Sequence, residues 1–214
     1  MSEGDPQPET RAVRKQAAIL DAAGQVFLKN GYVGTSMDEI AAAASVSKQT
    51  IYKHFVDKET LFKQLITSTV RPHGYEAADE PVFTGNTNLD EDLRVFARHL
   101  LHGVMQPRVV QLRRVVIAEA SRFPELGRTF YDLGHARTVN MLADALTKRA
   151  AEAALDIADP HLAAEHLVWL VLSIPLNQAM LLGDEHVVAS EALDRYADAG
   201  VSTFLAAYSL SARR

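Results

Sequence analysis

Five polar side chains fall within six consecutive positions, at Lys48, Gln49, Thr50, Tyr52 and Lys53. Lysine and glutamine can hydrogen-bond the edges of bases in the major groove, threonine can contact bases or phosphates, and tyrosine and lysine suit phosphates. The chemistry that this set favours is non-covalent recognition of double-stranded DNA. Such recognition needs the five side chains on a short helix whose angle is fixed by its neighbours.

Capping patterns predict the helices that would hold this segment. Ser36 and Glu39 form a capping box, in which the Ser36 hydroxyl accepts from the Glu39 amide and the Glu39 carboxylate accepts from the Ser36 amide. Ser47 can cap a second helix, and only residues 44–46 link the two. So short a link forces a sharp crossing, which is the helix-turn-helix arrangement. Asp57 can cap a third helix that runs to about Val70 or Arg71.

A longer helix is predicted before these three, from about Arg11 to Lys29, and it ends at Asn30-Gly31. Its apolar residues recur at helical spacing and form the expected buried stripe, Ile19, Ala23, Val26 and Phe27. The helix that follows Asp57 has a comparable stripe, Leu61, Phe62, Leu65 and Ile66. Together these stripes predict a compact helical domain around the DNA-reading segment.

This segment resembles the DNA-binding domain of the TetR family of transcriptional regulators. The residues that carry the resemblance are Gly31-Tyr32, Thr35-Ser36, Ile40-Ala41, Ala44, Val46-Ser47, Ile51-Tyr52, His54-Phe55, Lys58 and Leu61. Their spacing is unbroken from Phe27 to Leu61, and the match covers roughly the first third of the chain. Ser45 departs from the pattern, because the family most often has glycine in this turn. A non-glycine residue with positive φ is strained there but tolerable.

The resemblance also implies roles for individual residues. Lys48, Gln49 and Thr50 are expected to read bases. Ser47, which caps the same helix, is also expected to belong to the DNA-binding residues. Phosphate contacts are expected from Thr35, Ser36, Tyr52, Lys53, His54 and Lys58.

Charge and composition agree with this interpretation. Residues 11–63 carry eight Lys and Arg against five Asp and Glu, whereas the whole chain has a net charge of −5. The basic balance therefore lies where phosphates would be bound. The chain has no cysteine, no apolar run of membrane-spanning length and no signal peptide at its start, so we expect a cytoplasmic protein without a membrane partner.

Every strong pattern in the chain is helical, so the expected fold class is all-α. We expect a disordered tail at 1–10, a helix-turn-helix domain at 11–56, a connecting helix at 57–71, and a larger helical effector-binding and dimerisation domain at 72–214. Helices in this last domain are predicted at about 89–105, 107–123, 124–155, 160–182 and 190–210.

The last two helices predict a homodimer. The helix at about 160–182 is apolar over much of its circumference, so it must be covered on two sides. A two-fold partner can cover one side, although a buried central helix in a monomer would show the same pattern. The resemblance implies dimerisation through the helices at about 160–182 and 190–210. A dimer would also span two half-sites of a palindromic operator about 34 Å apart.

A small, mostly apolar effector is the second expected partner. Pro175 interrupts its helix, and Ser173 and Asn177 flank the interruption with polar groups. Aromatic or flexible candidates for the walls of the pocket are Phe96, Met105, Phe123, Phe130, Tyr131, Met141 and Trp169, each of which could equally be plain core.

No cofactor or metal is expected. His99 and His102 share one helix and His135, His161 and His166 lie elsewhere, which is weak support for a metal site that needs three or four converging ligands. Hydrogen-bonded or solvated histidines are the expected outcome.

The sequence thus indicates a ligand-controlled TetR-type repressor. A DNA-binding protein without a small-molecule switch remains an alternative. A helical enzyme is a weaker one, because no phosphate loop, nucleophile elbow or zinc-protease motif occurs.

Overall fold

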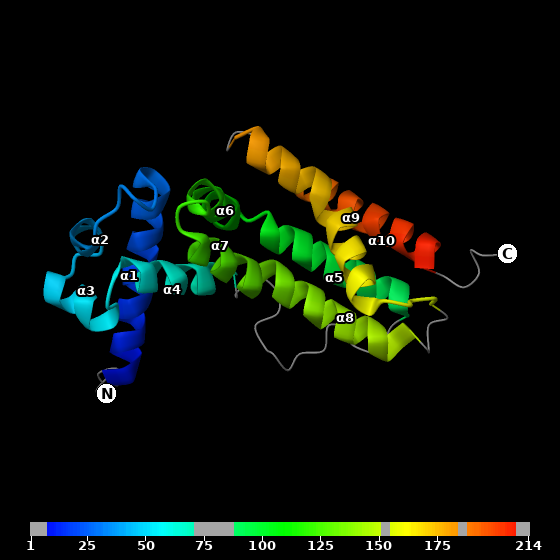
Figure 1. Ribbon diagram of the computed structural model, residues 1–214, viewed down its shortest axis with the longest axis horizontal. Coiled ribbons are helices and arrows are strands. Elements are labelled where there is room, and N and C mark those ends of the chain that lie inside the picture. Colours follow the sequence, from blue (N-terminus) through cyan, green and yellow to red (C-terminus); the bar gives the residue numbers. More distant parts are fainter. Residues whose placement is uncertain (1–7, 71–87, 151–154, 184–187, 209–214) are drawn as a thin grey trace, which may run out of the picture. The chain divides into compact units, whose positions relative to one another are not determined.

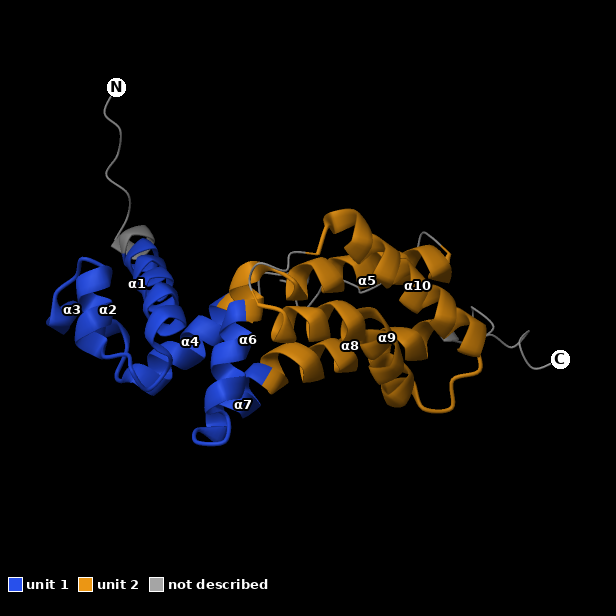
Figure 2. Cartoon of the chain, turned by 90° about the horizontal axis from the view of Figure 1, so that it is seen from above, with its two compact units in different colours: residues 1–68, 111–130 blue, residues 69–110, 131–214 orange. Residues whose placement is uncertain are grey.

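A computed structural model describes residues 8–70, 88–150, 155–183 and 188–208 of the chain (Figure 1). All regular elements within these ranges are helices, which confirms the all-α class. None of the described helices is both long and apolar enough to cross a bilayer. The chain divides into two compact units, Met1–Ser68 with Gln111–Phe130, and Thr69–Val110 with Tyr131–Arg214 (Figure 2).

The first unit begins with α1 (Pro8–Asn30), α2 (Met37–Ala43), α3 (Lys48–His54) and α4 (Lys58–Val70). The helix α1 starts three residues before the predicted Arg11, at Pro8. Proline suits the first turn, because its missing N–H has no helical partner there. Residues 1–7 of the expected tail lie outside the described residues.

An aromatic cluster forms the centre of this unit. The ring of Phe27 on α1 meets the ring of Phe62 on α4 edge-on, with centroids 4.7 Å apart. Tyr32, just after α1, lies 5.8 Å from Phe27 and 5.1 Å from Phe62. Ile40 from α2 and Ile51 from α3 are also fully buried. Side chains from all four helices are therefore removed from water, which stabilises their crossing angles.

The unit also includes residues from α6 (Pro107–Glu119) and α7 (Pro124–Tyr131), which the predicted boundaries assigned to the C-terminal domain. The Phe123 ring lies 4.9 Å from the Tyr32 ring and extends the aromatic cluster. The helix predicted to reach Phe123 ends instead at Glu119, whose carbonyl accepts from the amides of Arg122 and Phe123 at 2.9 and 2.8 Å. The turn that these bonds close brings Phe123 out of the helix.

The second unit contains α5 (Leu89–Val104), a π-helical turn η1 (Asp132–Ala136), α8 (Arg137–Ala150), α9 (Pro160–Leu181) and α10 (Ser190–Tyr208). The helix predicted over 124–155 runs without a break from Pro124 to Ala150 as α7, η1 and α8 in succession, with a π-helical turn inside it, and residues 151–154 lie outside the described residues. A π-helical turn holds one more residue than an α-helical turn, and hydrophobic periodicity does not reveal it. The predicted helix ends at Arg71 and Leu210 and the loop at 72–88 fall mainly outside the described residues.

The helices α5, α8, α9 and α10 share one core. Its fully buried members include Leu93 and Phe96 from α5, Leu142 from α8, Leu167 from α9 and Phe204 from α10. The helix α9 passes through the buried Pro175 without ending. This core fixes the apolar side of α9, and the remaining apolar side chains of that helix stay exposed.

Ionic contacts fasten α5 to α10 beside this core. Arg98 binds both carboxylate oxygens of Asp198, at 2.9 and 2.7 Å, and His102 lies 2.8 Å from Asp194. Arg94 donates to the Asp198 carbonyl oxygen at 3.2 Å. Residues four apart on each helix thus form a ladder that fixes the register of α10 against α5.

Candidate nucleic-acid interface

The capping box predicted at the start of α2 is present. The Glu39 amide donates to Ser36 Oγ at 3.2 Å, and the Ser36 amide donates to Glu39 Oε2 at 2.8 Å. These hydrogen bonds to the carboxylate, first from the Ser36 amide, lower the pKa of Glu39. Two amides that the helix itself cannot satisfy are thereby paired, and the start of α2 is fixed.

The turn between α2 and α3 is a Schellman motif. The Ser45 amide donates to the Ala42 carbonyl at 3.1 Å, and the Val46 amide donates to the Ala41 carbonyl at 3.0 Å. Ser45 has a φ of +54°, as predicted for the position where the family most often has glycine. The motif requires this left-handed residue, and a side chain there carries a strain of about 1–2 kcal/mol.

The helix α3 is held at its start and its centre. Ser47 accepts from the Thr50 amide at 3.1 Å, and the two hydroxyls lie 2.8 Å apart. Ile51 is fully buried and anchors the inner side of the helix. The predicted cap is confirmed. The Thr50 hydroxyl also shares a hydrogen bond with the Ser47 hydroxyl.

The outer side of α3 presents the predicted polar residues, because Lys48, Gln49, Tyr52 and Lys53 are all exposed. Lys48 Nζ lies 2.9 Å from Asp38 Oδ2 on α2, and this contact raises the pKa of Lys48. Both partners are well exposed, so the pair is weak and can open when a base or phosphate competes for the ammonium. His54 is half-buried, and Ser36 remains exposed beside the α2 cap.

The structure places Thr35 and Lys58 differently from their predicted phosphate contacts. Thr35 is only 3% exposed and donates to the Gly31 carbonyl at 2.7 Å. Lys58 Nζ donates to the Tyr32 carbonyl at 2.8 Å and to the Thr35 carbonyl at 2.9 Å, and lies 4.7 Å from the centre of the Tyr32 ring. Burial lowers the pKa of Lys58. Both side chains fasten the turn between α1 and α2, where Gly31 has a φ of +71°.

The predicted effector residues have different surroundings within each unit. Phe96 belongs to the core of the second unit, and Met105 packs at its edge, while Met141 is half-buried on α8. Phe123 and Phe130 belong to the first unit.

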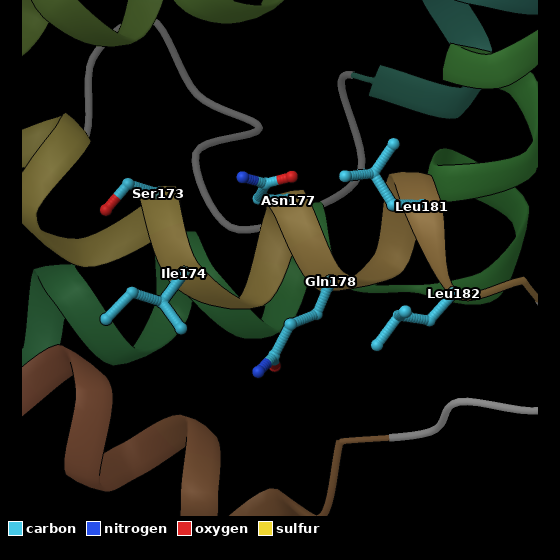
Figure 3. A pocket seen from close by; sticks show the side chains of 6 residues that line it. All are labelled: Ser173, Ile174, Asn177, Gln178, Leu181 and Leu182. Atoms are coloured by element: carbon cyan, nitrogen blue, oxygen red, sulfur yellow. The ribbon is translucent and has the colours of Figure 1, made fainter.

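Ser173 and Asn177 are exposed, and they line an open hollow of about 410 Å³ on α9 with four neighbours, Ile174, Gln178, Leu181 and Leu182 (Figure 3).

The rings of Tyr131 and Trp169 each have their centroid 5.3 Å from that of the His135 imidazole. Both aromatic side chains are exposed, and His135 Nε2 lies 2.9 Å from Glu165 Oε2. The sequence interpretation missed this pair, since the π-helical turn that carries His135 has no clear sequence signal.

Three of the histidines have hydrogen-bond partners, as expected. His102 meets Asp194, His135 meets Glu165, and His166 Nδ1 lies 2.7 Å from the Tyr208 hydroxyl. Within the described ranges, no group of three or more His, Asp or Glu side chains is arranged to hold a metal ion.

A buried aromatic core, two capped helices joined by a Schellman turn, and an exposed polar side on the second helix define a helix-turn-helix DNA-binding regulator. Comparison with known proteins agrees. The model of the N-terminal domain of bacterial regulatory proteins of the tetR family matches residues 19–65. The model of the C-terminal domain of AefR-like transcriptional repressors matches residues 91–210.

Similar structures extend over nearly the whole chain. A TetR-family transcriptional regulator from Mesorhizobium loti is 40% identical, with a TM-score of 0.81, over 94% of this chain and 99% of that chain. The flavonoid-responsive regulator FrrA is 37% identical, with a TM-score of 0.75, over 92% and 98% of the two chains. The curated HTH-type transcriptional regulator YhgD of Bacillus subtilis is 34% identical over 84 residues, which are 38% of this chain and 44% of that protein.

The chain spans less than half of the length of this curated relative. The two family models together nevertheless cover both parts of the chain. The protein belongs to the TetR family of transcriptional regulators, whose members bind DNA and are not enzymes.

Proposed function

We propose that the protein is a dimeric repressor that binds a palindromic operator and is released from it by a small aromatic effector. The observation that carries the DNA-binding part is the exposed polar side of α3, with Lys48, Gln49, Tyr52 and Lys53 beside a rigid cap. Lys48, Gln49 and Thr50 would read bases. Ser36, Tyr52, Lys53 and His54 would contact phosphates, and the protein would act in the cytoplasm, where the operator lies.

The exposed apolar surface of α9 supports the dimer. Six large apolar side chains on this helix and its C-cap are at least 40% exposed, namely Leu162, Trp169, Leu170, Ile174, Leu181 and Leu182. A row of this size is costly to leave in water, and a second copy of the same helix, with α10 beside it, would cover it. The hollow that Ser173 and Asn177 line lies on the same row and would then belong to the interface (Figure 3). A dimer would place two α3 helices about 34 Å apart, one helical turn of DNA.

The similarity to a flavonoid-responsive regulator supports an aromatic polyphenol as the effector. The helix α4 connects the reading helices to the second unit along the chain, since its last residues, Thr69 and Val70, already belong to that unit. A ligand that changes the second unit, or the helix α6 that spans both units, would move α4 and alter the separation of the two α3 helices. Because both ligands bias one equilibrium, DNA and effector would weaken each other's binding.

Selection of bound DNA from a random pool tests the DNA-binding part. We expect an inverted repeat whose half-sites are about 10 base pairs apart, centre to centre. Gln49→Ala should relax the base preference at one position of each half-site, while wild-type protein retains it. Recovery of sequences without symmetry would contradict a dimer on a palindrome.

Release of the selected operator tests the switch. A mobility-shift titration with the flavonoid naringenin, with sucrose as the control compound, should free the DNA in the first case only. If neither naringenin nor a library of planar aromatic compounds releases the operator, the protein is a DNA-binding protein without a small-molecule switch.

A further inference from the structure

Arg113 on α6 is a partly buried cation for which the described residues supply no counterion. Its Nε is inaccessible to water and has no hydrogen-bond partner, and no carboxylate of the described residues pairs with it. The guanidinium carbon lies 5.0 Å from the centre of the Phe130 ring on α7. Burial lowers the pKa of Arg113, and no neighbouring charge opposes this effect.

The neighbours of Arg113 along α6 provide no acidic side chain to pair with it. The side chains three and four positions away on α6 are all aliphatic, Val109, Val110, Val116 and Ile117. Glu119, the nearest acid along the helix, lies toward Gly31, where an added Cβ would stand 3.8 Å from its Oε1. The adjacent Arg114, by contrast, does have an interaction partner. Buried charges in proteins are normally paired, because an unpaired one loses its hydration without compensation.

We propose that Arg113 recognises an anionic oxygen of the effector, a carboxylate or an ionised phenol on a ligand whose remaining body is apolar. The guanidinium offers several N–H donors in one plane, which suits such a group, and the Phe130 ring holds it from one face. The aliphatic neighbours on α6 suit an apolar body. Arg113 is only partly exposed, so a bound anion would be shielded from water and its hydrogen bonds strengthened. This inference rests on the proposed effector-controlled function.

Binding of matched small probes to the full-length protein tests the proposal. The probes are 4-nitrophenol and 4-nitrobenzoate, which carry the two kinds of anionic oxygen, and the uncharged 4-nitroanisole. We expect at least one anion to bind more tightly than 4-nitroanisole, and bound 4-nitrophenol to absorb as the phenolate. In Arg113→Gln the affinity for the anion should fall about tenfold or more, as for loss of a charged hydrogen bond. Arg114→Gln, the matched control, should bind like wild type.

Equal affinity for charged and uncharged probes, an equal loss of both in Arg113→Gln, or no binding of any probe would overturn the proposal. Melting temperature without ligand gives a second measurement. Arg113→Met should be at least as stable as wild type, because it removes an unpaired buried charge. A lower melting temperature would show that the guanidinium is already paired within the free protein, and would also overturn it. Failure of both naringenin and the library of planar aromatic compounds to release the operator would refute the switch alone, since probe binding is measured without DNA.

Discussion

Replacing Lys58 by methionine distinguishes two roles of this lysine, hydrogen bonding to backbone carbonyls within the fold and binding of a DNA phosphate. Methionine keeps most of the apolar stem beside Tyr32 but removes the ammonium, so the carbonyls of Tyr32 and Thr35 lose their donor. A hydrogen bond from a charged group contributes about 1.5–3 kcal/mol, and the desolvation that lowers the pKa of Lys58 offsets part of the two bonds. We therefore expect a net loss of about 1.5–3 kcal/mol in the free energy of unfolding, close to the value of one such bond.

The assay combines melting temperature with the salt dependence of operator binding. For a chain of this length, the expected loss of stability lowers the melting temperature by about 3–12 °C. The slope of log affinity against log salt concentration should stay unchanged in Lys58→Met, because a lysine that binds carbonyls releases no counterion from DNA. Lys53→Ala is the matched control: its slope should become shallower by about 0.9, as for one lost phosphate contact, at unchanged melting temperature.

The opposite pattern would refute this reasoning. A shallower slope in Lys58→Met with an unchanged melting temperature would mean that Lys58 leaves the carbonyls and binds phosphate. Lys58→Arg provides a further check, because a guanidinium keeps the charge but does not fit the site of a single ammonium. Lys58→Arg should keep the salt slope of wild type and retain only part of its thermal stability.

Three further predictions concern the turns and the dimer. Ser45→Gly should raise the free energy of unfolding by about 1 kcal/mol in denaturant titration, because glycine adopts the φ of +54° without strain; a loss of stability would contradict the strained turn. Burial raises the pKa of Tyr32 to about 12, above the unfolded value near 10, so folding stability should fall as pH rises from 10 towards 12. Tyr32→Phe should remove this decline, and an unchanged decline would assign it to other groups. Trp169, the only tryptophan of the chain, should become less accessible to iodide as protein concentration rises through the dimer range, whereas in Leu181→Glu quenching should not depend on concentration. A wild-type protein whose quenching is equally independent of concentration would argue against the α9 interface.

Local chemistry made the helix-turn-helix segment predictable. The capping box of Ser36 and Glu39, the cap at Ser47 and the left-handed Ser45 each depend on residues within a few positions of one another, and all three occur as expected. Burial of Ile51 also follows from helical spacing. Exposure of the DNA-reading side chains could therefore be predicted without knowledge of the remaining chain.

Contacts between residues that are distant in the sequence account for the differences between the sequence-based predictions and the structure. Lys58 meets carbonyls 23 and 26 positions earlier, and Phe123 meets Tyr32 across 91 positions, so neither pairing has a local signal. A basic residue next to a DNA-reading helix was interpreted as a phosphate contact because its charge alone is visible in the sequence. The π-helical turn at Asp132–Ala136 is a further case, since periodicity averages over the single extra residue.

Two partly buried cations of the first unit show how pairing separates structural from functional charge. Lys58 has carbonyl oxygens at hydrogen-bonding distance and an aromatic ring beneath it, so its charge is satisfied within the fold. Arg113 also has an aromatic ring but no oxygen among the described residues, so its charge is left for a group that the chain itself does not provide there. If burial alone determined how each cation contributes to stability, substitution by an apolar residue should change the melting temperature in the same direction at both sites. We instead expect opposite signs: Lys58→Met should lower the melting temperature, and Arg113→Met should maintain or raise it.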